Sequence, residues 1–123
     1  MARYDFVSLW NKQKDFNLNF FDFNVKGVEL QQKLTKEFVL HVEDEAHELL
    51  SEINWKMDQY KTKDVNRAKL LEEWIDIFKY WLGIGNVWGF TLEDFFNEFW
   101  RKSVIVDERY KKYMNGKKKD NDK

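Results

Sequence analysis

The stretch LLEEWIDIFKYWLGIG, residues 70–85, decides the fold class of this chain. Apolar residues recur in it at steps of three and four, which is typical of one face of an α-helix. These residues are Leu70, Leu71, Trp74, Ile77, Phe78, Trp81 and Leu82. We expect this helix to begin near Asp64 and to end at Gly83 and Gly85, because glycine often follows the last turn of a helix.

Helical spacing also predicts the elements on either side of this stretch. A first helix is expected over about Tyr4 to Asn17, and a longer one, with room for one break, from about Gly27 to Tyr60. Between them, Leu18 to Lys26 alternates apolar and polar residues, which fits either a short extended segment or an irregular loop. No proline interrupts the 123 residues, so long helices are favoured.

The last helix has recognisable start and stop signals. Thr91 is followed three residues later by Asp94, which resembles a capping box, and apolar residues then continue toward Tyr113. Gly116 is expected to stop this helix. The remaining KKKDNDK, residues 117–123, predicts a charged, disordered tail.

The sequence thus predicts an all-α protein, a compact bundle of four to five helices in a single domain over residues 1–116. A helical domain of this size has little interior, and 18% of its residues are aromatic. We therefore expect a partner subunit to cover part of that aromatic surface, most simply in a homodimer.

Charge and composition exclude several classes of function. The 21 basic and 22 acidic side chains nearly cancel, which argues against a protein that binds nucleic acid by its overall charge. The absence of cysteine excludes disulfides, thiolate zinc sites and a cysteine nucleophile. No apolar run is long enough to span a membrane, and the beginning MARYDFVSLW does not resemble a secretory signal. A cytoplasmic location is expected.

Two acidic pairs lie at helical spacing on consecutive predicted helices. Residues three apart share one helix face, so Glu45 with Glu48, and Glu73 with Asp76, can each direct two carboxylates to one ion. The 24 residues between Glu48 and Glu73 are enough to finish one helix, turn and start an antiparallel partner. Four converging carboxylates would require a cation, and oxygen ligands favour Mg²⁺, or Mn²⁺, over zinc.

The alternative interpretation is that these acids only solvate helix faces, since 35% of the chain is charged. The surrounding residues favour a site, because both FVLHVEDEAHELLSEINWK and LLEEWIDIFKYW are strongly apolar. Two other patterns are not sites. His41 and His47 are six residues apart and do not share a helix face, and the glycines at 83, 85 and 89 lack the lysine of a phosphate loop.

The ordered set of these motifs resembles a known family. Glu45-Ala-His-Glu48 is followed by Trp55-Lys56, seven and eight residues after the second glutamate, and then by Glu73-Trp-Ile-Asp76. This order is similar to that of the all-α nucleoside triphosphate pyrophosphatases, especially the dimeric dUTPases and their MazG-like relatives. The segment WNKQKDF, residues 10–16, is similar to the first helix of the family.

The resemblance implies a magnesium-dependent reaction in which water attacks the α-phosphorus of a nucleoside triphosphate and releases pyrophosphate. It implies metal ligation by the four acids of the two pairs, with Glu48 as the first candidate for activating the water. It also implies substrate contacts, which we assign to Gln13, Trp55, Lys56, Lys102 and Arg109. Gln13 is suited to a uracil edge, because its amide carries both a donor and an acceptor.

One family position departs from the pattern. The family often carries K-x-x-x-N-x-x-R near the end of the domain, and this chain has Lys102 and Arg109 at that spacing with Val106 in place of asparagine. The expected substrate is dUTP, and a MazG-like preference for other nucleoside triphosphates is the first alternative. A non-catalytic helical dimer that binds a protein partner is the second.

Overall fold

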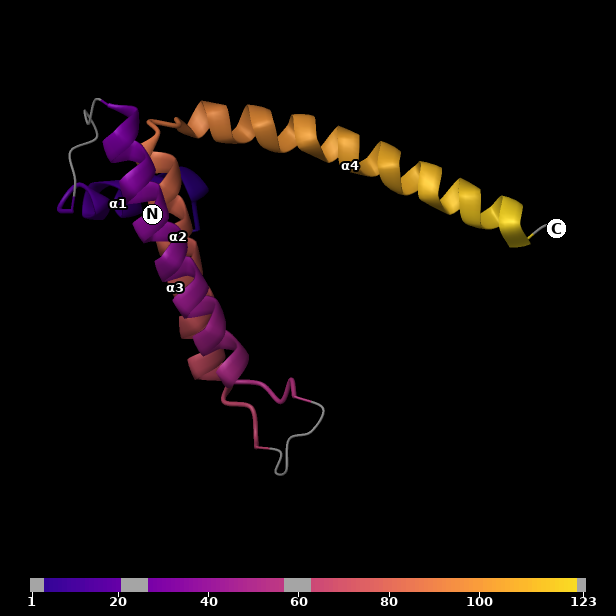
Figure 1. Cartoon of the computed structure of the whole chain (residues 1–123), viewed down its shortest axis with the longest axis horizontal. Helices are drawn as coiled ribbons and strands as arrows, with labels where there is room; N and C mark the ends of the chain where they lie inside the picture. The colour runs from indigo at the N-terminus through magenta and orange to yellow at the C-terminus, as the bar shows by residue number, and fades with distance from the viewer. Residues whose placement is uncertain (1–3, 21–26, 57–62, 122–123) are drawn as a thin grey trace. The chain divides into compact units, whose positions relative to one another are not determined.

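The structure, a computed structural model, describes residues 4–20, 27–56 and 63–121, with side chains as far as residue 118. These residues form four helices and contain no strand (Figure 1). The helices are α1 (Phe6–Asn17), α2 (Val28–Ser51), α3 (Arg67–Val87) and α4 (Leu92–Asn121). The predicted all-α class is confirmed. Within the same residues, no helix is long and apolar enough to cross a membrane.

Side chains at the helix starts explain where three of the helices begin. The Asp5 carboxylate accepts a hydrogen bond from the Val7 amide of α1, and the Asn66 side chain accepts one from the Lys69 amide of α3. The predicted capping box is present at α4. The Thr91 amide donates to the Asp94 carboxylate at 2.9 Å, and the Asp94 amide donates to the Thr91 hydroxyl at 3.0 Å.

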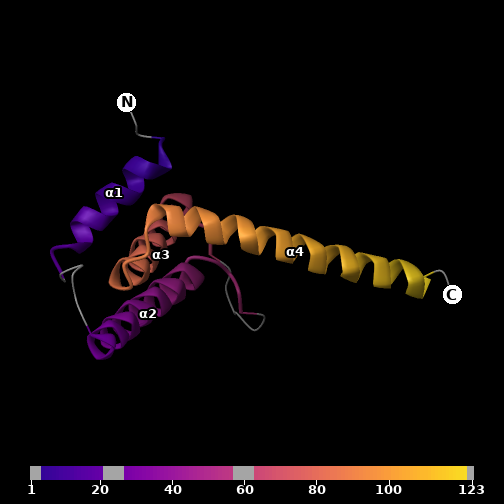
Figure 2. The ribbon, with the colours of Figure 1, turned by 90° about the horizontal axis from the view of Figure 1, so that it is seen from above.

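The chain divides into two units, residues 1–90 and residues 91–123. In the first unit, α2 and α3 lie side by side as an antiparallel hairpin, and α1 packs against α3 (Figures 1 and 2). The second unit consists of α4, a single uninterrupted helix. The assignment of residues 1–116 to one catalytic domain stays a prediction.

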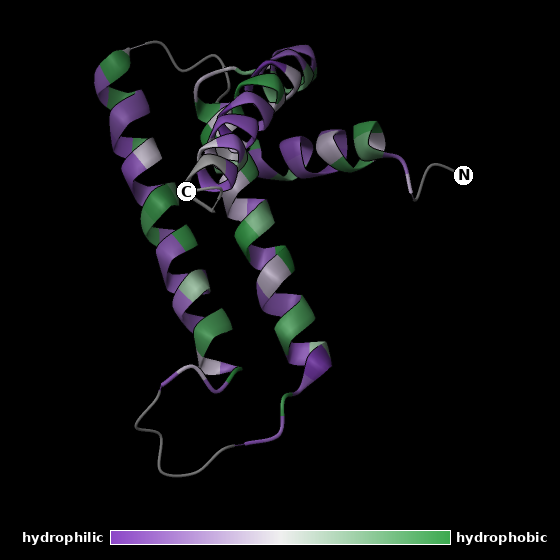
Figure 3. Ribbon diagram, turned by 90° about the vertical axis from the view of Figure 1, so that its right-hand side faces the viewer, coloured by the Kyte–Doolittle hydropathy of each residue, from purple (hydrophilic) through white to green (hydrophobic). Residues whose placement is uncertain are grey.

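The interior of the first unit is small. Among the described residues, the buried hydrophobic side chains are Trp10 on α1 and Leu82 and Val87 on α3. Apolar and polar bands alternate along both helices of the hairpin (Figure 3). Each helix therefore has a narrow apolar face, and polar side chains are also buried where the helices meet.

Two predicted helix ends are wrong. Gly83 and Gly85 lie inside α3, which continues to Val87, and the turn comes at Gly89, where φ is +70°. A glycine ends a helix by adopting positive φ, and neither Gly83 nor Gly85 does so. Likewise α4 passes through Gly116 and continues to Asn121. Glycine lowers helix stability by only about 1 kcal/mol, which neighbouring turns can tolerate.

Gly83 has a packing role instead. It is buried on α3, facing the ring of Phe38 on α2. A Cβ atom placed on Gly83 would lie 2.7 Å from one ring carbon of Phe38 and closer still to another. The missing side chain therefore lets the two helices of the hairpin approach at this point.

The connection between α2 and α3 is longer than the sequence predicts. Leu18 to Phe20 form a turn after α1, whereas the rest of the segment to Lys26 lies outside the described residues. Helix α2 ends at Ser51, earlier than predicted. After the gap at residues 57–62, the Lys63 amide donates to the Asn54 side-chain oxygen at 3.0 Å, and the Asn54 amide group donates back to the Lys63 carbonyl at 2.8 Å. This pair holds the described ends of the connection together.

Candidate metal centre

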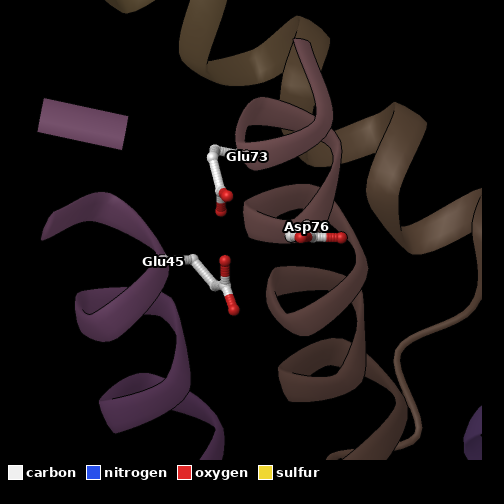
Figure 4. Close-up of side chains that lie close together, drawn as sticks. All are labelled: Glu45, Glu73 and Asp76. Carbon is white, nitrogen blue, oxygen red and sulfur yellow. The ribbon is translucent and has the colours of Figure 1, made fainter. Parts of the chain in front are cut away.

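Three of the four predicted acids converge between α2 and α3. Glu45 comes from α2, and Glu73 and Asp76 come from α3, one turn apart. One carboxylate oxygen of each lies within 4.8 Å of those of the other two. Glu45 and Glu73 point toward each other across the gap between the helices (Figure 4). This group of three, which we call the acidic cluster, could hold a metal ion.

The carboxylates of the acidic cluster are more buried than carboxylates that only face solvent, which favours a bound cation. Glu73 is buried, and Glu45 and Asp76 are partly buried. The Oε2 atoms of Glu45 and Glu73 are both buried and have no hydrogen-bond partner. A carboxylate oxygen removed from water without a partner is costly, and a divalent cation would supply the missing interaction. All donors are oxygen atoms, which suits Mg²⁺ and Mn²⁺.

The crowding of negative charge shows in the pKa values. The pKa of Glu73 is raised to about 7, first by a hydrogen bond with Glu45 that requires a shared proton, then by burial and by Glu48. The pKa of Glu45 is also raised, chiefly by burial. The nearest cation, the Lys69 ammonium, is 4.0 Å from Glu73 and half exposed, so it neutralises the cluster only weakly.

Glu48 lies beside the acidic cluster but is not one of its three members. Its side chain is exposed on α2, one turn beyond Glu45. Its interaction with Glu73 contributes to the raised pKa of that group, so the two carboxyl groups are neighbours. The assignment of Glu48 as a metal ligand and as the group that activates water stays a prediction.

The raised pKa of Glu73 predicts how stability depends on pH without metal. Between about pH 4.5, the ordinary value, and pH 7 the folded protein holds a proton that the unfolded chain releases. The melting temperature of the metal-free protein should therefore fall as the pH rises through this window and level off above it. Thermal unfolding in the presence of a chelator, from pH 4 to pH 8.5, measures this.

Glu73→Gln should remove most of this decline, because glutamine does not titrate. Glu72→Gln, at the exposed neighbour, is the matched control and should leave the decline unchanged. A decline that persists in Glu73→Gln and disappears in Glu72→Gln would contradict the assignment.

A cavity of about 650 Å³ opens next to the acidic cluster and is lined by α1, α2, α3 and the turn after α1. Glu45 and Asp76 belong to its wall. The other lining residues are Gln13, Phe16, Asn17, Phe20, Leu34, Glu37, Phe38, His41, Lys79 and Tyr80. Aromatic side chains and amides thus adjoin the carboxylates in one space, large enough for a small organic molecule.

A chain of side-chain amides runs from the cavity wall on α1, where Gln13 and Asn17 lie, to α3. The Gln13 amide donates to the Asn17 oxygen at 3.0 Å, and the Asn17 amide donates to the Asn86 oxygen at 2.9 Å. All three side chains are buried, and Nδ2 of Asn86 has no partner. Gln13 was predicted from the sequence as a substrate contact, whereas Asn17 and Asn86 were not. The signal was available, because Trp10, Gln13 and Asn17 share the buried face of α1.

Two further features of the cavity wall were not predicted. His41 stacks on Tyr80, with ring centroids 4.7 Å apart and planes 11° from parallel. The pKa of the Tyr80 hydroxyl is raised by burial and by the nearby Glu45 and Asp76. Lys79, the residue after Phe78 on α3, adds an exposed cation to the wall. Lys79 and Tyr80 lie one helical turn after Asp76 on α3, whereas the approach of α2 to α3 brings His41 to Tyr80.

The remaining predicted substrate contacts lie outside this cavity wall. Trp55 and Lys56 follow α2 and are exposed, with the Lys56 ammonium 5.5 Å from the centroid of the Trp55 ring. Lys102 and Arg109 are exposed on α4, which belongs to the other unit. The roles assigned to these four residues stay predictions.

Comparison of the chain with protein-family models, with curated proteins and with solved structures gave no match.

Proposed function

We propose that this protein is a magnesium-dependent nucleoside triphosphate pyrophosphohydrolase, as its motifs resemble those of the all-α family. One observation carries the proposal: three carboxylates from two antiparallel helices converge beside a cavity that Glu45 and Asp76 line, and two of their oxygen atoms are buried without a partner. The reaction is the attack of water on the α-phosphorus, which yields a nucleoside monophosphate and pyrophosphate.

In this proposal Glu45, Glu73 and Asp76 hold the metal. Magnesium bound there neutralises charge on the phosphates and lowers the pKa of a bound water. Glu48, exposed beside the cluster, accepts the proton of the attacking water. Its exposure suits this role, because an exposed carboxylate can pass the proton on to solvent.

The amide chain supports a role in recognising the base. Gln13 and Asn17 line the cavity, and each amide offers a donor and an acceptor to a planar heterocycle. The edge of uracil presents the complementary acceptor and donor, so we propose dUTP as the substrate. The phenylalanine rings of the same cavity supply apolar surface against which a base can pack.

Cations near the site would hold the phosphates. Lys79 is the one described lysine on the wall of the cavity next to the acidic cluster. We propose Lys56 and Arg109 as further phosphate contacts, in line with the family resemblance, and Trp55 as a wall for the base. Arg109 would bind two oxygen atoms at once, whereas a lysine acts as a point charge.

A panel of nucleoside triphosphates tests the proposal. The purified protein is incubated with magnesium and dUTP, dCTP, dTTP, the purine deoxynucleotides or UTP, and the products are separated by ion exchange. We expect monophosphate and pyrophosphate, with dUTP cleaved fastest. Preference for another base would assign the protein to the MazG-like alternative. No turnover of any member, at a magnesium concentration that saturates the protein, would favour the non-catalytic dimer.

Gln13→Ala should raise the KM for the preferred nucleotide by about tenfold, because it removes one hydrogen bond to the base and leaves another group unpaired. Turnover at saturation should change little, since the amide is far from the reacting phosphorus in this proposal. Steady-state kinetics measure both values. Lys12→Ala, at an exposed position on the same helix, is the control. A fall in kcat with an unchanged KM would contradict a role in base binding.

A further inference from the structure

Apolar residues follow α4 with the spacing of a coiled coil. Alternate steps of four and three residues, starting at Leu92, lead through positions 96, 99, 103, 106, 110 and 113. Their occupants are Leu92, Phe96, Phe99, Ser103, Val106, Tyr110 and Tyr113. A repeat of 3.5 residues keeps one face of a helix turned toward a partner helix over its whole length. Here it lasts for about three heptads, or roughly 30 Å of helix.

This face of α4 is exposed in the structure. Phe99, Val106, Tyr110 and Tyr113 are each more than half exposed. Trp100 and Met114 flank the repeat and are exposed as well. The opposite face carries mostly charged residues, with the Glu98 carboxylate paired to the Arg101 guanidinium, although Val104 is exposed outside the repeat. Single exposed apolar residues are normal on the surface of a monomer, whereas a continuous apolar stripe of this length is not.

Charges beside the stripe indicate which partner it fits. Lys102 and Arg109 lie on one flank, at the positions that precede Ser103 and Tyr110, and Asp107 lies on the other, directly after Val106. In a parallel pair of identical helices, a residue on the Lys102 flank approaches the residue five places further along the partner, on the opposite flank. Lys102 then faces the partner's Asp107, twice by symmetry. In an antiparallel pair, Lys102 would instead approach the partner's Arg109, and the like charges would repel.

We infer that α4 pairs with α4 of a second copy of this chain as a parallel two-stranded coiled coil over residues 92–113. Composition predicted a homodimer, and this pairing defines its interface. The pairing does not depend on the proposed catalysis. It assigns Lys102 to an ion pair between subunits and not to a phosphate. Ser103, the one polar residue of the stripe, fixes the register, because a small polar side chain packs best against its own copy.

The absence of cysteine from the chain permits a direct test of this geometry. In a parallel pair, Ser103 faces the partner's Ser103, within the distance of about 7 Å between Cα atoms that a disulfide requires. Under mild oxidation, Ser103→Cys should therefore form a covalent dimer on a non-reducing gel. Glu108→Cys, on the outer face of the same helix, is the matched control and should remain monomeric.

Sedimentation of the full chain supplies a second measurement. The unmodified protein should sediment as a dimer, and Val106→Asp should raise the dissociation constant at least about a hundredfold, because it buries two unpaired carboxylates at the contact. Circular dichroism should show that this variant keeps its helices. A wild-type monomer at tens of micromolar would overturn the inference. So would a dimer in which neither Ser103→Cys nor Val106→Cys cross-links alone while the double variant Ser103→Cys, Val106→Cys does, since a disulfide that needs both cysteines joins position 103 of one helix to position 106 of an antiparallel partner.

Discussion

Replacing Glu73 by glutamine is expected to lower magnesium-dependent turnover at least about a thousandfold. The reason is that a metal-dependent enzyme loses several kcal/mol of transition-state stabilisation when one ligand of its metal is removed. Glu73 is the buried member of the acidic cluster, and its Oε2 atom has no protein partner. Glutamine keeps the shape of the side chain and removes the charge. The loss should therefore reflect the cation and not the fold.

Two measurements separate those causes. Titration calorimetry with Mg²⁺ and Mn²⁺ should show binding to the wild type and a large loss in Glu73→Gln. Thermal unfolding without metal at pH 8 should show that Glu73→Gln is at least as stable as the wild type, since it relieves repulsion with Glu45 and Glu48. Glu72→Gln, at the exposed adjacent residue, should leave binding and turnover unchanged.

Asp76→Asn is the companion variant on α3 and should behave in the same way. A Glu73→Gln protein that binds magnesium as tightly as the wild type would contradict the metal centre. If the wild-type protein binds magnesium but shows no turnover, the metal centre is supported and the proposed enzymatic function is contradicted.

The second large effect is expected at Gly83. Gly83→Ala should lower the free energy of unfolding by about 1–3 kcal/mol, the usual cost of adding a methyl group to a full interior. The new Cβ atom would meet three carbons of the Phe38 ring at less than van der Waals distance. Either the ring must turn or the two helices must separate. Because Phe38 lines the cavity, substrate binding should weaken as well.

Gly85→Ala is the control within the same helix, and urea unfolding compares the two. The Cβ atom there would lie 4.0 Å from Cβ of Phe90, an ordinary contact, so this variant should gain up to about 1 kcal/mol from helix propensity. Adding Phe38→Leu to Gly83→Ala should restore part of the lost stability, whereas the two changes should be simply additive if they do not meet. Equal effects of Gly83→Ala and Gly85→Ala would contradict the packing role.

Several features of the molecule followed from local sequence alone. The helical period predicted α1 and α3, and the pair Thr91 and Asp94 predicted the start of α4, because these interactions join residues only three or four apart. The spacing of Glu73 and Asp76 likewise put two carboxylates on one face of a helix. Glycine was a weaker signal, since it ends a helix only when its backbone takes positive φ, and the residue type does not fix this.

For the acidic pairs, local spacing predicted the candidate ligands but not which of them meet. The sequence predicted that Glu45, Glu73 and Asp76 could share an ion, and it gave Glu48 the same standing. The structure brings the first three within 4.8 Å and leaves Glu48 exposed beside them, because the rotation of α2 against α3 decides which side chain enters the gap. The packing of α1 against α3 in turn brings Asn17 to Asn86, which are 69 residues apart. Short-range spacing thus determined the helices and the candidate ligands, while the packing of one helix against another decided which of them meet.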